Sequence, residues 1–154
     1  MQAKLRRALS LTPRDWGILT EAWLTLLWVD FTISCLPYPW WKGWLAQSMN
    51  LSSPAVSPNP EATERLVYLI NAAANHHIGK PTCLRRSLTL REMLKRRKIP
   101  AILRMGIRKE GSRVDAHAWT ECNGTVINDS PDVSTRFSPL PTLSKELLQQ
   151  IHNQ

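Results

Sequence analysis

Three short stretches decide the fold: CLRRSL at residues 83–88, AHAW at residues 116–119 and VIND at residues 126–129. The first follows Thr82, a favoured N-cap residue, so we expect Cys83 in the first turn of a helix. The other two flank an Asn-Gly turn signal, which predicts an antiparallel hairpin. The sequence therefore predicts an α+β domain in which a helix carries Cys83 and a hairpin carries His117 and Asp129.

Helical spacing predicts where the thiol points. Cys83, Ser87, Leu90 and Leu94 share one helix face because they follow the i, i+4, i+7, i+11 pattern. Most of the basic residues of this helix lie off that stripe. We therefore expect the thiol to point toward the sheet that the helix packs on.

The hairpin allows two registers. A two-residue loop would pair Cys122 with Thr125 and would put His117 on the face opposite Asp129. A three-residue loop would pair Glu121 with Thr125, and His117 would then face Asp129 with Cβ atoms about 4.5–5.5 Å apart. Only the second register makes a His–Asp pair, so we predict the three-residue loop.

Cys, His and Asp in these positions suit a cysteine nucleophile. A free thiol has a pKa of about 8.5, and a helix N-terminus and an imidazolium both stabilise its thiolate. A carboxylate orients the imidazole and supports its positive charge. Each residue alone is more often structural, but together they favour a triad of Cys83, His117 and Asp129 for acyl transfer at an amide bond, most simply peptide hydrolysis. The backbone N–H of Cys83 and the side chain of Asn75 are candidate oxyanion donors.

Composition excludes several other kinds of site. The three cysteines of this 154-residue chain form no CxxC pair, so neither a zinc site nor a disulfide framework is expected, and reduced thiols fit the cytoplasm. We expect no metal and no cofactor, since no phosphate-binding glycine loop is present either.

The net charge is +8, and eleven of the 20 Lys and Arg residues lie between Arg85 and Arg113. Such a field favours acidic partners, namely a peptide, a membrane surface or nucleic acid, although a solvated helix face and the C-terminus of a helix explain most of it. Of these partners we expect no nucleic acid.

The chain divides into three parts. Residues 1–47 form an apolar, Trp-rich segment, and its helix starts at the N-cap Thr12. Residues 48–60 form a Ser- and Pro-rich linker, and residues 61–154 form the main domain. Within the main domain we predict helices over 60–75, from 82 and over 142–151, strands over 101–108, 114–121 and from 125 to about 128, and a loop over 130–141.

The N-terminal helix is apolar nearly all round and needs a cover. Glu21 and Asp30 argue against a membrane span. We expect the helix to dock on its own domain or on a partner, with Trp23 and Trp28 as candidate contacts, and peripheral membrane contact is the alternative.

The block CLRRSLTLREMLKRRKIPAILRMGIRKEGSRVDAHAWTECNGTVIND, residues 83–129, resembles the signature of the lasso-peptide leader peptidases. These have a transglutaminase-like, papain-related cysteine protease domain, and the likeness is strong over about residues 60–130. The chain departs from the family at Lys98, where Gly is common. Some members also carry a fused winged-helix recognition domain, for which the first 47 residues are too few.

The resemblance implies a transglutaminase-like fold over residues 61–154 and a catalytic triad of Cys83, His117 and Asp129. It implies that the chain cleaves a ribosomal precursor between leader and core, with a discrete winged-helix protein presenting the leader and a separate asparagine-synthetase-like cyclase closing the ring. Arg104 and Arg108, on the basic side of their strand, are candidate contacts for acidic leader residues. Two alternatives stay open: a transglutaminase-type acyltransferase that uses the same triad, and a non-catalytic peptide-binding module.

Overall fold

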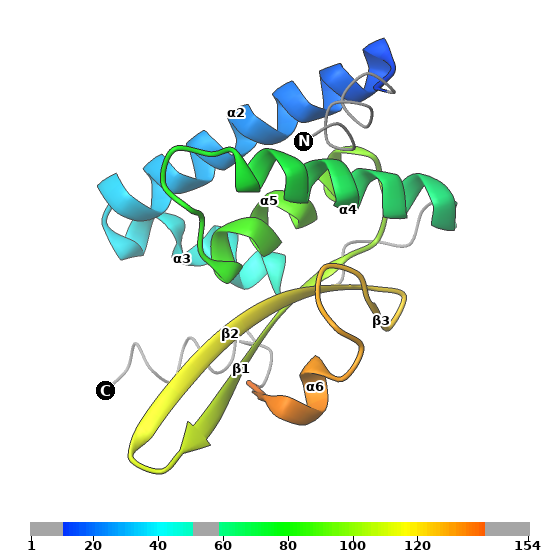
Figure 1. Ribbon diagram of the computed structural model, residues 1–154. Coiled ribbons are helices and arrows are strands. Elements are labelled where there is room, and N and C mark those ends of the chain that lie inside the picture. The colour runs from blue at the N-terminus through cyan, green and yellow to red at the C-terminus, as the bar shows by residue number, and fades with distance from the viewer. Residues whose placement is uncertain (1–10, 51–58, 141–154) are drawn as a thin grey trace.

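A computed structural model describes residues 11–50 and 59–140 (Figure 1). Its elements, in chain order, are α2 (Pro13–Cys35), α3 (Tyr38–Ser48), α4 (Pro60–Asn75), α5 (Cys83–Arg96), β1 (Ile102–Glu110), β2 (Arg113–Cys122), β3 (Thr125–Val126), α6 (Val133–Arg136) and β4 (Ser138–Pro139). The four longer helices gather on one side of the antiparallel sheet, and the β1–β2 hairpin extends away from them (Figure 1). The predicted α+β class is confirmed. The predicted helix over 142–151 and most of the predicted linker lie outside the described residues.

The first helix begins where the sequence predicts. The Thr12 hydroxyl accepts a hydrogen bond from the Asp15 backbone N–H, and the Asp15 carboxylate accepts one from the Thr12 N–H, which is a complete capping box. Arg65 of α4 then donates two hydrogen bonds to the same carboxylate, at 3.2 and 2.9 Å. This cap therefore also ties the start of α2 to α4.

Helix α3 was not predicted, because its Pro- and Trp-rich sequence reads as a break. Pro37 ends the first helix, but Pro39 in the first turn suits a new helix start. Trp44 of α3 donates from its indole N–H to Glu92 of α5 at 3.0 Å. The chain thus turns back after α2 and fastens α3 to α5.

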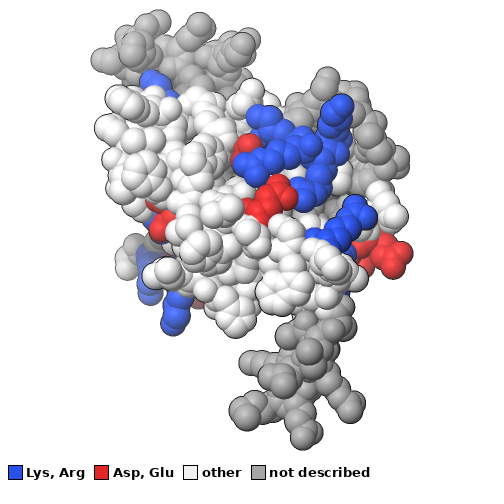
Figure 2. Space-filling model, turned by 90° about the horizontal axis from the view of Figure 1, so that it is seen from above, with Lys and Arg blue, Asp and Glu red and all other residues white. Residues whose placement is uncertain are grey.

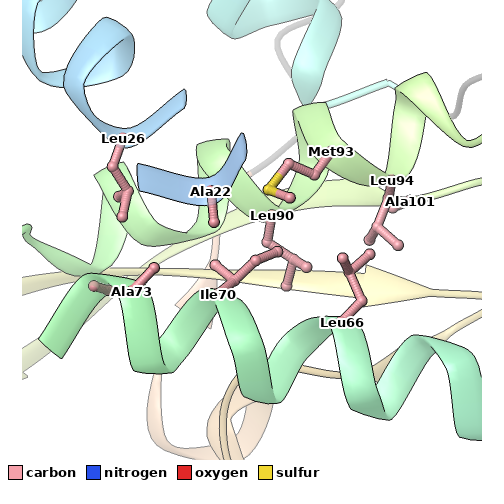
Figure 3. Packing of buried hydrophobic residues seen from close by; sticks show 10 residues of the cluster. Ala22, Leu26, Leu66, Ile70, Ala73, Leu90, Met93, Leu94 and Ala101 are labelled. Atoms are coloured by element: carbon pink, nitrogen blue, oxygen red, sulfur yellow. The ribbon is translucent and has the colours of Figure 1, made fainter. Parts of the chain in front are cut away.

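Helices α2, α4 and α5 share one hydrophobic core (Figure 3). Its fully buried members include Ala22, Leu26, Leu66, Ile70, Ala73, Ala74, Leu90, Met93, Leu94 and Ala101. Burying a leucine contributes roughly 1.5–3 kcal/mol to folding, so Leu26 makes α2 part of what stabilises the domain. The division at residue 47 stays a prediction, but this core continues across it.

The sheet has the order β3-β2-β1-β4 and is antiparallel throughout. Leu103 and Ala118 pack against Leu88 of α5 on the helix side. On the other face, Trp119 of β2 packs with Val133 and Phe137. These last two residues come from the stretch 130–141, which the sequence predicts to be a loop. Gly106 lies under this cover, where an added Cβ would come within 3.0 Å of the Phe137 Cβ and of the Trp119 ring. The loop after β3 therefore closes the second face of the sheet.

Candidate active site

Cys83 is the first residue of α5, and its side chain is half-buried. Thr82 before it has extended backbone (φ −64°, ψ 166°), and its carbonyl accepts from the Arg86 N–H at 3.0 Å. The helix therefore begins where the sequence predicts, although the Thr82 hydroxyl makes no capping hydrogen bond. Backbone N–H groups in the first turn of a helix lack intrahelical partners, and the helix dipole is positive there, so these groups can stabilise a negative charge that develops beside Cys83 during a reaction.

His117 and Asp129 form a direct pair. Nε2 of His117 on β2 lies 2.5 Å from Oδ2 of Asp129. Both side chains are about three-quarters buried, with 25 % and 24 % of their surface exposed. With its proton on Nε2, the ring donates to the carboxylate, and Nδ1 is then the nitrogen that can accept a proton from a thiol.

The predicted three-residue hairpin loop is wrong. Cys122 pairs with Thr125, and Asn123 and Gly124 form a two-residue turn with positive φ angles of 51° and 78°. The pairing of β3 stops at Val126, so the rule that opposite residues share a face does not extend to Asp129. The carboxylate reaches His117 from a loop instead.

Asn128 guides that loop. Its side-chain oxygen accepts the Thr120 backbone N–H at 2.7 Å, in the place where a continued strand would have supplied a carbonyl. Its amide nitrogen donates to the Ser87 hydroxyl at 2.9 Å. The chain therefore leaves β2 after Ile127 while staying fastened to it, and Asp129 is delivered next to His117.

Ser87, one turn after Cys83, joins the helix to the sheet. Its fully buried hydroxyl donates to the Ala118 carbonyl at 3.1 Å, and its backbone carbonyl accepts from the Thr120 hydroxyl at 3.2 Å. These bonds fix α5, which carries Cys83, against the strand that carries His117. The sequence shows Ser87 only as a polar residue within a buried stripe, which is the one signal that could have found it.

Asp129 is kept ionised by its surroundings. Burial raises the pKa of Asp129, but hydrogen bonds from His117 and Ser130 and the nearby charge of His117 outweigh burial and leave the pKa of Asp129 below its usual range. Arg136 adds a cation 3.4 Å from Oδ1. The carboxylate therefore carries its charge at neutral pH and can support an imidazolium.

An aromatic ring packs on the imidazole. The Phe137 ring lies 4.9 Å from that of His117, at 26° between planes, and the Trp119 ring lies 6.4 Å away. The Arg108 guanidinium covers the Phe137 ring at 5.0 Å. Phe137 thus restricts how His117 can turn, and sequence reasoning missed it because it lies in an irregular stretch.

One cleft contains all three predicted catalytic residues. It has a volume of about 340 Å³ and is lined by Asn71, Pro81, Cys83, Arg86, Ser87, His117, Ala118, Asn128 and Asp129. Thiol, imidazole and carboxylate therefore open to one space that a peptide segment can enter. Such an arrangement can perform nucleophilic acyl transfer.

Comparison with protein families agrees with this geometry. A family model described as "Transglutaminase-like superfamily" matches residues 25–142. The chain belongs to the transglutaminase-like superfamily. This superfamily generally comprises cysteine-dependent enzymes, and the matched region begins inside α2 and includes every residue that lines the cleft. No curated protein and no solved structure matched the chain.

Within this transglutaminase-like domain, the predicted oxyanion donor Asn75 lies outside the cleft. Asn75 is exposed at the end of α4 and does not line the cleft, whereas Asn71, one turn earlier, does.

Among residues 11–50 and 59–140, no group of three or more His, Cys, Asp or Glu side chains is placed to hold a metal ion. Burial raises the pKa of the Cys122 thiol, which makes that cysteine a poor nucleophile.

The predicted binding residues have partners inside the domain. Arg104 pairs with Glu121 at 3.0 Å, and Arg108 pairs with Asp115 at 3.0 Å. Trp23 packs beside the buried ring of His77 at 6.0 Å. Trp28 packs edge-to-face on Trp44 at 5.1 Å and stays 48 % exposed. A role for the two arginines in binding a leader stays a prediction, and of the two tryptophans Trp28 offers more free surface.

Proposed function

We propose that the chain is a cysteine peptidase that removes the leader from a ribosomally made lasso-peptide precursor. The observation that carries this proposal is the His117–Asp129 pair, 2.5 Å apart, on the same cleft as Cys83 at a helix N-terminus. The resemblance of residues 83–129 to the leader peptidases supports the substrate, and membership of the transglutaminase-like superfamily supports cysteine-dependent chemistry.

The proposed reaction begins at Cys83. Its thiol gives a proton to Nδ1 of His117, and Sγ attacks the carbonyl carbon of the last leader residue. The C–N bond breaks, the proton passes from His117 to the departing amine of the core peptide, and the leader remains on Sγ as a thioester. Water, deprotonated by His117, then attacks the thioester, so the leader leaves as a carboxylic acid and the thiol is restored.

Three groups support the charges that develop. Asp129 stabilises the imidazolium, since its carboxylate already accepts from Nε2. The first-turn N–H groups of α5 suit the oxyanion, and the backbone N–H of Cys83 is the nearest by sequence. Asn71 is the amide side chain of α4 that lines the cleft, and we propose it as the oxyanion donor in place of Asn75.

The partners belong to the same proposal. We propose that a discrete winged-helix protein presents the leader; residues 13–48 of this chain form α2 and α3, which pack on the domain as covering helices. A lasso cyclase then takes the freed core amine. We expect the reaction to take place in the cytoplasm, since reduced thiols persist there and all three cysteines, Cys35, Cys83 and Cys122, are unpaired.

Intact mass spectrometry tests the proposal. The purified chain is incubated with precursor and recognition protein, with Cys83→Ala and the matched control Cys35→Ala, which removes an exposed thiol at the end of α2. We expect two fragments whose masses sum to precursor plus water, and a rate at least about a thousandfold lower for Cys83→Ala only. A mass adduct in place of cleavage would identify a transferase. Leader binding without any product in every variant would identify a binding module.

A further inference from the structure

The outward side of α2 carries a continuous apolar stripe, which we call the outer stripe: Trp16, Thr20, Leu24, Leu27, Trp28 and Phe31. Four of these side chains are about half exposed, Trp16 at 56 %, Leu24 at 56 %, Trp28 at 48 % and Phe31 at 58 %. They recur every three, four or eight residues, so they line one side of the helix for most of its length. A soluble monomer rarely exposes so large an apolar surface without a use for it.

The inward side of the same helix has no aromatic residue among its buried side chains. These buried residues are Asp15, Ala22, Thr25, Leu26, Val29 and Thr32. Trp16, Trp28 and Phe31 are exposed, while Trp23 packs beside His77. Of the described residues, only α2 is long and apolar enough to cross a membrane by length and composition, and 28 % of its most apolar window is buried. Packing on α4 and α5 thus leaves most of the aromatic side chains of α2 outside the core.

Every acid of α2 is paired with an arginine of a neighbouring helix. Asp15 binds Arg65 of α4, Glu21 binds Arg96 and Arg97 of α5, and Asp30 binds Arg85. The hydroxyl of Thr20 donates back to the Trp16 carbonyl at 2.9 Å. The stripe therefore presents no negative charge, and its hydroxyl is already occupied.

Cations accumulate beside the stripe. Arg96 and Arg97 pair with Glu21 on one flank, where the single carboxylate offsets only one of the two positive charges. Lys95 and Lys98 belong to the same end of the α5 region. The space-filling view from above shows a broad uncharged surface bordered by a group of Lys and Arg side chains with Asp and Glu among them (Figure 2). Arg14 and Lys42 are exposed at positions just before and after the apolar run, and Tyr38 and Trp40 follow α2 as exposed aromatics.

We propose that the outer stripe docks flat on the surface of an anionic lipid bilayer. Apolar aromatic side chains beside Lys and Arg are what the interface between acyl chains and anionic headgroups accepts. A spanning orientation is excluded by the three acid–Arg links and by the core contacts of Ala22 and Leu26, which would all have to break. A protein partner is the alternative occupant, and the experiment below separates it from a bilayer.

Vesicle flotation tests this proposal without relying on catalysis. The protein carries Cys83→Ala, so that an environment-sensitive fluorophore can be attached to the exposed Cys35 while Cys122 stays buried. Vesicles of phosphatidylglycerol and phosphatidylcholine are compared with phosphatidylcholine alone. We expect the labelled protein to float with the anionic vesicles with a blue-shifted emission, and binding to weaken at high salt.

Two variants locate the contact. Leu24→Ser, Trp28→Ser and Phe31→Ser together should lower the partition coefficient by about tenfold or more. The matched control replaces Tyr68, Ile78 and Val114, which are exposed apolar residues of other elements, by Ser and should change the partition coefficient by less than about twofold. Circular dichroism checks that both variants fold.

Four outcomes would overturn the proposal: absence of binding to anionic vesicles, equal loss in both variants, a dimer that dissociates only in the stripe variant, or a stripe needed only for binding the recognition protein. None of them bears on the proposed peptidase activity, which is measured with soluble precursor.

Discussion

The hydrogen bonds around Ser87 give the sharpest test of how the site is held together. Ser87→Ala removes a fully buried hydroxyl that donates to the Ala118 carbonyl and accepts from Asn128. Each lost hydrogen bond costs about 1 kcal/mol net, and a buried partner left unsatisfied costs about 1–3 kcal/mol. We therefore expect Ser87→Ala to lower the free energy of unfolding by about 2–4 kcal/mol.

Urea denaturation measures this loss, and a double-mutant cycle identifies its origin. Asn128→Ala removes the other side of the same contact and also the acceptor of the Thr120 N–H. Because the two side chains share a hydrogen bond, the double variant should cost at least about 0.5 kcal/mol less than the sum of the single variants. Ser134→Ala, at an exposed position of α6, is the control and should change stability by less than about 0.5 kcal/mol.

The same variants should affect turnover more than binding. Ser87 lies one turn from Cys83 and bonds to the residue after His117, so its loss leaves thiol and imidazole less well aligned. We expect kcat for precursor cleavage to fall about tenfold or more while KM changes little. Additive stability losses within about 0.3 kcal/mol, or an unchanged kcat in a variant that is measurably destabilised, would refute this account of the site.

Three further predictions concern the sheet and the dyad. Gly106→Ala should lower stability by about 1–3 kcal/mol, measured by thermal unfolding, because its Cβ would meet Phe137 and Trp119 at 3.0 Å; an unchanged Tm contradicts this. Phe137→Leu should slow cleavage, since the His117 ring loses its stacking partner and turns more freely; a wild-type rate would show that the ring is held without it. The pKa of Asp129 is lowered on folding, so its contribution to stability is complete above an unfolded pKa of about 3.9 and declines as the pH falls below that value. Acid titration of Asp129→Asn should therefore show a shallower loss of stability than wild type below about pH 4, and parallel curves would argue against the ionised pair.

Local signals account for what the sequence predicted well. The Thr12 and Thr82 positions mark the starts of α2 and α5 because helix starts depend on a few neighbouring residues. Alternating residues likewise predicted β1 and β2 to within about two residues at each end. These elements alone placed Cys83 at a helix N-terminus.

Long-range contacts explain the failures. The meeting of His117 and Asp129 was predicted from a wrong register, because the sequence does not show that β3 stops at Val126 or that the Asn128 side chain takes over. Phe137 was missed because its stretch has no periodicity and is ordered by packing on Gly106. Asn75 was chosen by closeness in sequence, whereas the turn of α4 brings Asn71 to the cleft.

The position of the carboxylate loop in the chain also has a consequence for synthesis on the ribosome. Asp129, Arg136 and Phe137 all come from the last twelve described residues, 129–140, and the Ser87–Asn128 bond joins residues 41 apart. The helical core, in contrast, is complete by Ala101. A nascent chain can therefore bury its core well before it can assemble the dyad, so the proposed peptidase activity would be absent from a growing polypeptide until nearly the whole domain has emerged.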